Sequence, residues 1–240
     1  MGKHKKVERS GSSFVLLVGE ILLTAGMVFS GYVAYELWGS NLEAQQVWED
    51  STSQLKMEFD EEYEKYLDTN PTVTPEQFKL TKEPVKGKPF AMAYIPKLWG
   101  SNLVVPINEG VDDSDLVDGL GRYPSTQLPS SGGNFAIAGH RATHGEPFAN
   151  FQILEVGDEV IIETLAGRYF YELVSDIKVL PEDVWVLESR PNIPALKSLP
   201  EDSQFITLTT CDPRRSSEKR WIWFGVMKSF TPRSELGSGV

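Results

Sequence analysis

The 240-residue sequence has little of the two residue types that build disulfide frameworks and zinc sites. It holds one cysteine, Cys211, and three histidines, His4, His140 and His144. A single cysteine excludes an intramolecular disulfide and a cysteine-rich zinc site. Basic residues are also in the minority, because 23 Lys and Arg stand against 34 Asp and Glu, a formal net charge of −11. Such an acidic chain repels phosphate backbones, so we expect no nucleic-acid partner.

One apolar run is long enough to cross a membrane. Residues 14–38 read FVLLVGEILLTAGMVFSGYVAYELW, with Glu20 and Glu36 as their only charged residues. As a helix this run spans about 37 Å, more than the roughly 30 Å of a bilayer's hydrocarbon core. A cleaved signal peptide is the alternative, but its apolar core is usually about 7–15 residues long and precedes a small-residue cleavage site. No such site follows Trp38.

The charge before this run predicts its orientation. Residues 1–13 contain Lys3, Lys5, Lys6 and Arg9 against one acid, Glu8. Positively charged flanks stay in the cytoplasm. We therefore expect a single-pass protein of the cell membrane, with a cytoplasmic N-terminus and the rest of the chain on the extracellular face.

An acidic amphipathic helix is predicted after the span. Apolar side chains recur there at helical spacing, namely Leu55, Phe59, Tyr63, Tyr66 and Leu67. We interpret this segment as a solvated spacer helix that lies against the following domain, and a helix that self-associates or binds a partner is the alternative. A proline- and threonine-rich linker follows and completes a stalk over residues 39–88.

Short apolar runs replace the helical pattern from residue 89 on. We interpret seven of them as strands: FAMAYIP, NLVVPI, NFAIAGH, EVIIETL, RYFYELVSDIKVL, QFITLTTC and RWIWFGVM. Seven or eight strands predict a mostly β fold, a closed barrel or a sandwich with short helices. Residues 181–203 form a long irregular stretch, which we expect to be a packed functional loop or short helix.

These patterns divide the chain into five segments. They are a basic tail (1–13), a transmembrane anchor (14–38), a stalk and linker (39–88), a β domain (89–232) and a C-terminal tail (233–240).

Three residues suited to acyl transfer lie at predicted strand ends. Cys211 ends QFITLTTC, His140 ends NFAIAGH, and Arg220 opens RWIWFGVM. A thiol supplies a nucleophile, an imidazole moves protons near neutral pH, and a guanidinium presents several donors to one oxygen. A hairpin between the last two strands would bring Cys211 next to Arg220. A buried inert cysteine and a surface turn histidine are the alternatives, and no third metal ligand accompanies His140 and His144.

The spacing of these residues resembles the sortase family. GHRATHGEPF is followed about sixty residues later by TLTTCDP and then by an arginine that opens an apolar strand, and residues 207–211 fit the sortase motif TLxTC. The segments FAIAGHRATHGEPF and TLTTCDPRRSSEKRWI are most similar to class E sortases of high-GC Gram-positive bacteria. Those sortases typically have a tyrosine in the turn after the catalytic histidine, where this chain has His144. The resemblance extends over nearly the whole chain and implies a sortase-like closed β-barrel.

The resemblance implies a membrane-anchored cysteine transpeptidase. Its substrates would be secreted proteins with a C-terminal LPxTG-like sorting signal, and class E members favour LAxTG. Cys211 would attack the Thr–Gly carbonyl and form a thioester with the threonine, while His140 would move the protons. Arg220 would hold the substrate backbone or the oxyanion. The acceptor would be the amine of a lipid II-type cell-wall precursor, and no cofactor is implied.

Substrate contacts and metal ligands are less clearly marked in the sequence. The candidates for substrate binding are Thr209, Thr210, His144, Val184, Leu187 and Ile193. Core packing is an equally good interpretation of the three residues from 181–203. The acidic run between Glu109 and Asp118 could bind calcium, but we interpret it as a solvated loop and expect no metal.

Two alternative functions stay open. A pilin-polymerising sortase would use a lysine side chain as the nucleophile, and the lack of a second apolar span after the last strand favours the wall-anchoring role over it. A membrane-anchored assembly module would keep the barrel without any turnover.

Overall fold

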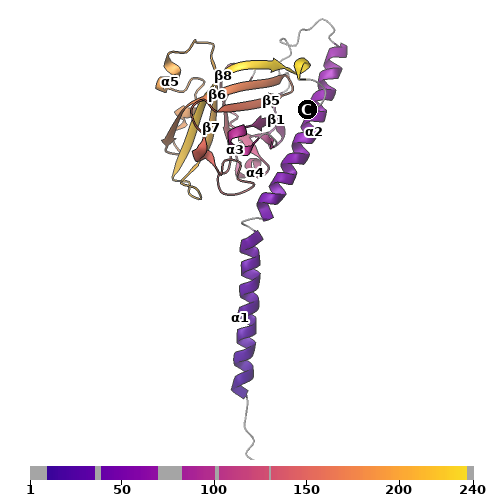
Figure 1. Cartoon of the computed structure of the whole chain (residues 1–240), viewed down its shortest axis with the longest axis vertical. Coiled ribbons are helices and arrows are strands. Elements are labelled where there is room, and N and C mark those ends of the chain that lie inside the picture. Colours follow the sequence, from indigo (N-terminus) through magenta and orange to yellow (C-terminus); the bar gives the residue numbers. More distant parts are fainter. Residues whose placement is uncertain (1–9, 36–38, 70–82, 101–102, 130, 237–240) are drawn as a thin grey trace, which may run out of the picture. The chain divides into compact units, whose positions relative to one another are not determined.

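The computed structural model describes residues 10–35, 39–69, 83–100, 103–129 and 131–236, and it separates into two compact units, 1–40 and 41–240. The first unit contains helix α1 (Ser10–Ala34), shown in Figure 1. Within the described residues, Phe14–Ala34 is the one helical stretch long and apolar enough to cross a membrane. The basic residues 1–9 and the last predicted residues of the span, 36–38, lie outside the described residues, so the orientation stays a prediction.

The second unit contains a closed β-barrel, as the sequence predicted. Within the described residues it has eight strands, in the spatial order β1-β2-β3-β4-β7-β8-β6-β5. The strands are β1 (Pro89–Tyr94), β2 (Val105–Glu109), β3 (Leu120–Arg122), β4 (Gly133–Ala138), β5 (Glu159–Thr164), β6 (Gly167–Val179), β7 (Gln204–Asp212) and β8 (Lys219–Pro232). Strand β3 was not predicted, because three residues are too few to show an alternating pattern.

Short helices connect and cover the strands. They are α3 (Pro96–Trp99), α4 (Asp113–Leu116), η3 (Phe151–Ile153), η4 (Val184–Leu187), α5 (Pro194–Lys197) and η5 (Arg233–Glu235). Arg233, the first residue beyond the predicted domain, is buried, and its Nη2 lies 2.8 Å from Glu163 Oε1. This ion pair fixes the chain to β5 after the last strand.

The alternation of side chains builds the barrel interior. Along β6, Tyr169, Tyr171 and Leu173 are buried and the residues between them are half-buried, which is the period-two pattern of a strand with one core face. Strand β7 differs, because residues 205–210 are all buried. It therefore has a second covered face on the outside of the barrel.

The irregular stretch after β6 supplies this outer cover, as predicted for a packed loop. Val186, Ile193 and Leu196 from η4, α5 and the loop between them pack with Phe205 of β7 and Phe224 of β8. The Asn134 side-chain amide donates to the carbonyls of Val186 and Glu188 at 3.2 and 3.0 Å. This bonding fixes the loop to the outside of the barrel next to β4 and β7.

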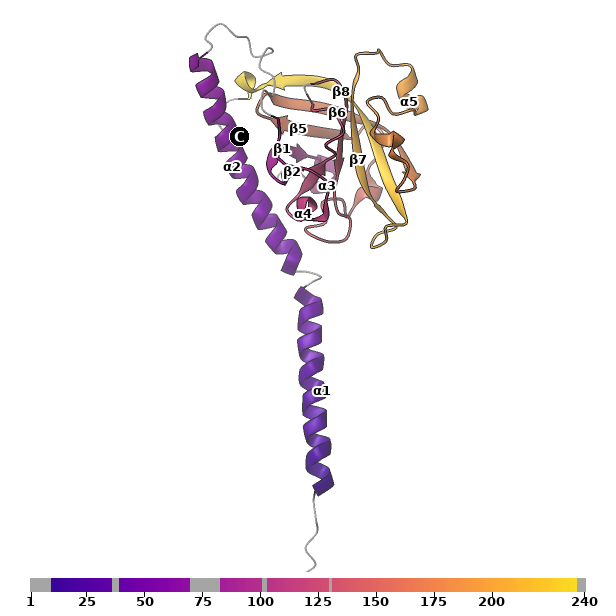
Figure 2. The same cartoon turned by 180° about the vertical axis from the view of Figure 1, so that it is seen from behind.

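Helix α2 (Ser40–Thr69) lies along the barrel, as Figure 2 shows from behind. Its predicted apolar residues Leu55, Phe59 and Tyr63 are buried against Met92 and Leu165. The buried face also extends toward the start of the helix, where Ala44 and Trp48 join the main barrel core. The helix is therefore part of the folded unit over most of its length.

The acidic run between Glu109 and Asp118 is not a solvated loop throughout, which corrects the sequence interpretation. Glu109 is buried in an ion pair with Arg122, with Oε2 2.7 Å from Nε. Asp115 is also buried and, with Asp112, forms the capping box of α4. These carboxylates serve the fold, because each has a local partner.

Replacing Trp48 tests whether α2 belongs to the core. Trp48 is 1% exposed, so Trp48→Ala should lower the free energy of unfolding by about 3–5 kcal/mol. Val47 is 38% exposed one residue away, so Val47→Ala should change it by less than about 0.5 kcal/mol. Chemical denaturation of the full-length protein in detergent micelles measures both. Equal small effects would show that the helix does not pack as described.

Candidate active site

Strand pairing brings Cys211 and Arg220 together. Strands β7 and β8 are antiparallel neighbours, and Cys211 pairs directly with Arg220. Directly opposed residues project to the same face of a sheet. Side chains an even number of residues apart on a strand lie on the same face. Phe205 on β7 and Phe224 on β8 belong to the outer cover, and each lies an even number of residues from Cys211 and Arg220, so these two also face outward. The hairpin predicted from the sequence is present.

Parallel pairing brings His140 to the same place. Strands β4 and β7 run side by side, with Ala138 paired to Thr209. Two hydrogen bonds continue past the end of β4, because Gly139 N–H donates to the Thr209 carbonyl at 3.1 Å and the Thr210 hydroxyl donates to the Gly139 carbonyl at 2.8 Å. These two bonds fix Gly139, the residue before His140, beside Thr209 and Thr210, the two residues before Cys211. The backbone of His140 is therefore held near the end of β7.

The electrostatic surroundings of His140 favour its neutral form. Burial, and next the nearby charge of His144, hold the pKa of His140 below its ordinary value, while Asp113 partly opposes them. The two imidazole rings lie 5.1 Å apart, centroid to centroid. Nε2 of His140 is buried and has no hydrogen-bond partner among the described residues. A neutral imidazole with an unpaired buried nitrogen is suited to exchange a proton with a bound group.

The other two groups have the access and donors that acyl transfer needs. Cys211 is a free, half-buried thiol. Arg220 Nη1 donates to the carbonyls of Ser217 and Lys219, at 3.1 and 3.2 Å. A guanidinium has five N–H donors, so bonds through one nitrogen do not exhaust it. Together with His140, these groups can therefore offer a nucleophile, a proton carrier and an oxyanion donor at the ends of neighbouring strands.

The loop that follows His140 is held from several sides. His144, Gly145 and Glu146 all have positive φ, of 53°, 75° and 50°. Gly145 lies against the indole of Trp48 so closely that a Cβ there would overlap the ring. Its N–H donates to Asn41 Oδ1 at 3.1 Å. Helix α2 is thus part of the packing that shapes this loop.

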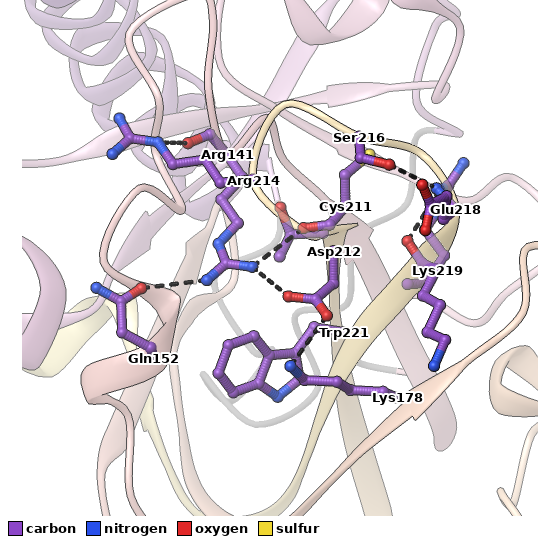
Figure 3. A network of polar contacts seen from close by, with 12 residues as sticks. Arg141, Gln152, Lys178, Cys211, Asp212, Arg214, Ser216, Glu218, Lys219 and Trp221 are labelled. Carbon is purple, nitrogen blue, oxygen red and sulfur yellow. Dashed lines mark hydrogen bonds and ion pairs between the residues drawn. The ribbon is translucent and has the colours of Figure 1, made fainter.

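Four further residues of the site were not recognised as such in the sequence. Arg141 and Asp212, which directly follow His140 and Cys211, form a buried ion pair, and Lys178 and Trp221 adjoin it (Figure 3). Three of these four residues directly follow a predicted site residue, as Trp221 follows Arg220, and that adjacency was a signal. The pairing itself joins residues 71 positions apart, which no local pattern reveals.

The predicted substrate contacts do not lie together. Thr209 and Thr210 are buried, and their hydroxyls donate to the carbonyls of Ile137 and Gly139, so they support the strands that carry the site. Ile193 is buried as part of the outer cover, whereas Val184 is 67% exposed. The remaining two, Leu187 and His144, are half-buried, and only His144 is described in contact with His140.

No metal site accompanies these residues in the described ranges. Within them, no group of three or more His, Cys, Asp and Glu side chains is arranged to hold a metal ion.

Comparison with known proteins places the chain among close relatives. Sortase SrtE1 of Streptomyces coelicolor is 35% identical over 97% of this chain, which spans 63% of that protein's length. A structure of sortase E from Streptomyces avermitilis is 35% identical, covers 64% of this chain and 97% of its own, and has a TM-score of 0.55. A crystal structure of sortase E1 from S. coelicolor, with a tripeptide in its active site, is 36% identical, covers 65% of this chain and 98% of its own, and has a TM-score of 0.57.

The family assignment rests on the part of the chain that forms most of the barrel. Residues 94–228 match the family described as Sortase domain, and this stretch runs from the end of β1 into β8. It includes Cys211, His140 and Arg220. The closed barrel, the outward-facing thiol and the matched domain agree, and the chain belongs to the sortase family.

Proposed function

We propose that this protein is a membrane-anchored cysteine transpeptidase that cleaves a C-terminal LAxTG- or LPxTG-like signal between Thr and Gly. The observation that carries the proposal is the register of β4, β7 and β8, which sets Arg220 opposite Cys211 and brings the segment that leads into His140 beside the end of β7. The similarity to class E sortases supports LAxTG as the preferred signal. The acceptor is an amine of the cell wall, such as that of a lipid II-type precursor.

In the first half of the reaction, the Cys211 sulfur attacks the carbonyl carbon of the threonine. His140 takes the thiol proton, and the negative charge that develops on the carbonyl oxygen is stabilised by Arg220. When the intermediate collapses, the Thr–Gly bond breaks and His140 gives its proton to the departing glycine amine. The threonine is left as a thioester on Cys211.

In the second half, an incoming amine attacks the thioester carbonyl. His140 takes a proton from the attacking nitrogen and returns it to the Cys211 sulfur as the thioester breaks. A new amide bond joins the threonine to the acceptor, and the enzyme recovers its thiol and neutral imidazole. The helix α1 anchors the enzyme in the cell membrane, with the barrel on the extracellular side, where exported proteins and wall precursors meet.

Substitution of Cys211 tests the proposed chemistry. Full-length protein in detergent micelles is incubated with LAxTG and LPxTG peptides and an excess of triglycine, and the products are followed by mass spectrometry. We expect cleavage between Thr and Gly and a triglycine-linked product, both absent with Cys211→Ala because no thioester can form. Intact peptides with folded wild-type protein would contradict the proposal and favour a non-catalytic assembly module. A lysine-linked product with a lysine-containing pilin peptide, in place of the triglycine product, would favour pilin polymerisation.

Substitution of Arg220 tests its role as the oxyanion donor. Arg220→Gln removes the guanidinium and should lower kcat by about 10²–10³-fold, the usual effect of removing such a donor. Lys219→Gln is the matched control, because Lys219 is an exposed cation on the preceding residue. It should stay within about twofold of wild type. Similar losses in the two variants would indicate that general charge, and not Arg220, matters.

The pH dependence of kcat/KM reports the state of His140. Because the pKa of His140 lies below its ordinary value of about 6.5, the neutral base persists to lower pH and activity should decline only below about pH 6.5. His144→Asn removes a neighbouring positive charge and should move this acid limb to higher pH. Asp113→Asn removes a negative charge and should move it to lower pH. Shifts of the same sign, or none, would contradict this assignment.

A further inference from the structure

Each of the three residues proposed to react is followed by a member of a second group of side chains. Arg141 follows His140, Asp212 follows Cys211, and Trp221 follows Arg220. Consecutive strand residues point to opposite faces, so Asp212 and Trp221 face inward where Cys211 and Arg220 face outward. Trp221 packs against the main barrel core accordingly.

These residues contact one another closely, as Figure 3 shows. Arg141 Nη1 lies 2.6 Å from Asp212 Oδ1, and Lys178 Nζ lies 2.9 Å from the other carboxylate oxygen. Both cations also cover the indole of Trp221, with Arg141 Cζ 4.9 Å and Lys178 Nζ 4.2 Å from the ring centroid. The two cations, Arg141 and Lys178, therefore share the carboxylate of Asp212 and the indole ring of Trp221.

Further contacts tie this group to the reactive backbone. Arg141 Nη1 also donates to the Cys211 carbonyl at 3.4 Å, and Nη2 donates to Gln152 at 3.3 Å. Lys178 of β6 pairs in register with Trp221 of β8. From the turn before β8, Arg214 Nε donates to the Arg141 carbonyl at 3.1 Å, and its guanidinium pairs with Glu146. The group thus connects the histidine loop to three neighbouring strands.

The ion pair between Arg141 and Asp212 is buried, and its surroundings keep Asp212 ionised. The side chains of Arg141 and Asp212 are only 9% and 12% exposed. Burial alone would raise the pKa of Asp212, but hydrogen bonds from Lys178 and Arg141 outweigh it and hold that pKa below its ordinary value. Loss of the Asp212 charge would leave the buried Arg141 guanidinium without its ion-pair partner, and the loop and strand end would shift to relieve it.

We propose that Arg141, Asp212, Lys178 and Trp221 form a positioning cluster that holds His140, Cys211 and Arg220 in register for acyl transfer. The inference rests on the proposed function of these three residues. The cluster touches no reacting atom and acts through the backbone, since each reactive residue is covalently next to one of its members. A misplacement of about 1 Å among reacting groups can cost about 10²-fold in rate.

The test compares two equally buried ion pairs in the same barrel. Asp212→Asn removes the carboxylate charge of the cluster with little change of shape. Glu109→Gln does the same to the Glu109–Arg122 pair, whose side chains are 7% and 6% exposed and which joins β2 to β3. Both variants are expected to unfold at lower denaturant concentration. Kinetics are measured with full-length protein in micelles, where circular dichroism shows each variant to be folded.

We expect Asp212→Asn to lower kcat by about 10–10²-fold with KM within about threefold of wild type, because the reactive groups are misplaced and the substrate surface is kept. Glu109→Gln should leave kcat within about twofold. Lys178→Gln removes the more exposed cation and should lower kcat about threefold; it decides the question if Asp212→Asn does not fold.

Two results with folded Asp212→Asn would overturn the proposal: a wild-type kcat, or a loss of kcat equal to that of Glu109→Gln. If Asp212→Asn does not fold, a wild-type kcat in Lys178→Gln would overturn it. Each leaves the transpeptidase assignment intact, because the wild type is active in all of them. An inactive, folded wild-type protein would instead remove the proposed function and the cluster's role with it.

Discussion

The site depends on the place of one strand, β7, between a parallel and an antiparallel neighbour. Parallel pairing with β4 brings the segment after Ala138 to the end of β7, and antiparallel pairing with β8 sets Arg220 opposite Cys211. Backbone hydrogen bonds between these strands therefore bring together residues from three distant parts of the sequence. A slip of one residue in either pairing would turn the thiol to the barrel interior. Register is thus the constraint on which the chemistry depends.

The outer face of β7 and β8 carries Cys211 and Arg220, and the inner face carries the residues proposed to position them. Cys211 and Arg220 face outward and remain partly exposed, as their proposed roles of nucleophile and oxyanion donor require. The next residue on each strand faces inward and is a charged or aromatic group held in fixed contacts. Buried ion pairs contribute little net stability compared with apolar packing, but they strongly resist displacement of either partner. Asp212 therefore suits a site that needs fixed geometry more than it needs extra stability.

How far the sequence predicted this protein depends on how local each signal is. Alternating runs such as RYFYELV are local signals, and they predicted the strands of the barrel. The motif around Cys211 is also local, and it predicted the candidate site residues His140, Cys211 and Arg220. Strand β3 has only three residues and was missed. The Arg141–Asp212 pair joins residues 71 positions apart and was not predicted. The acidic run that contains Glu109 was interpreted as a solvated loop, because its charge pattern does not reveal the ion pair with Arg122. The hydrogen bond from Arg214 to the Arg141 carbonyl, which holds the histidine loop, was also not predicted.

Helix α2 shows why the stalk cannot be treated as a spacer. Trp48 fills the space beside Gly145, and Asn41 accepts a hydrogen bond from the same residue, five positions after His140. Because Gly145 adopts positive φ and allows no Cβ against the indole, the loop conformation and the helix position specify each other. A fragment that begins after the stalk would lack this support and would expose Met92 and Leu165, which pack against α2. The smallest unit that preserves the histidine loop therefore includes the helix from residue 41 on.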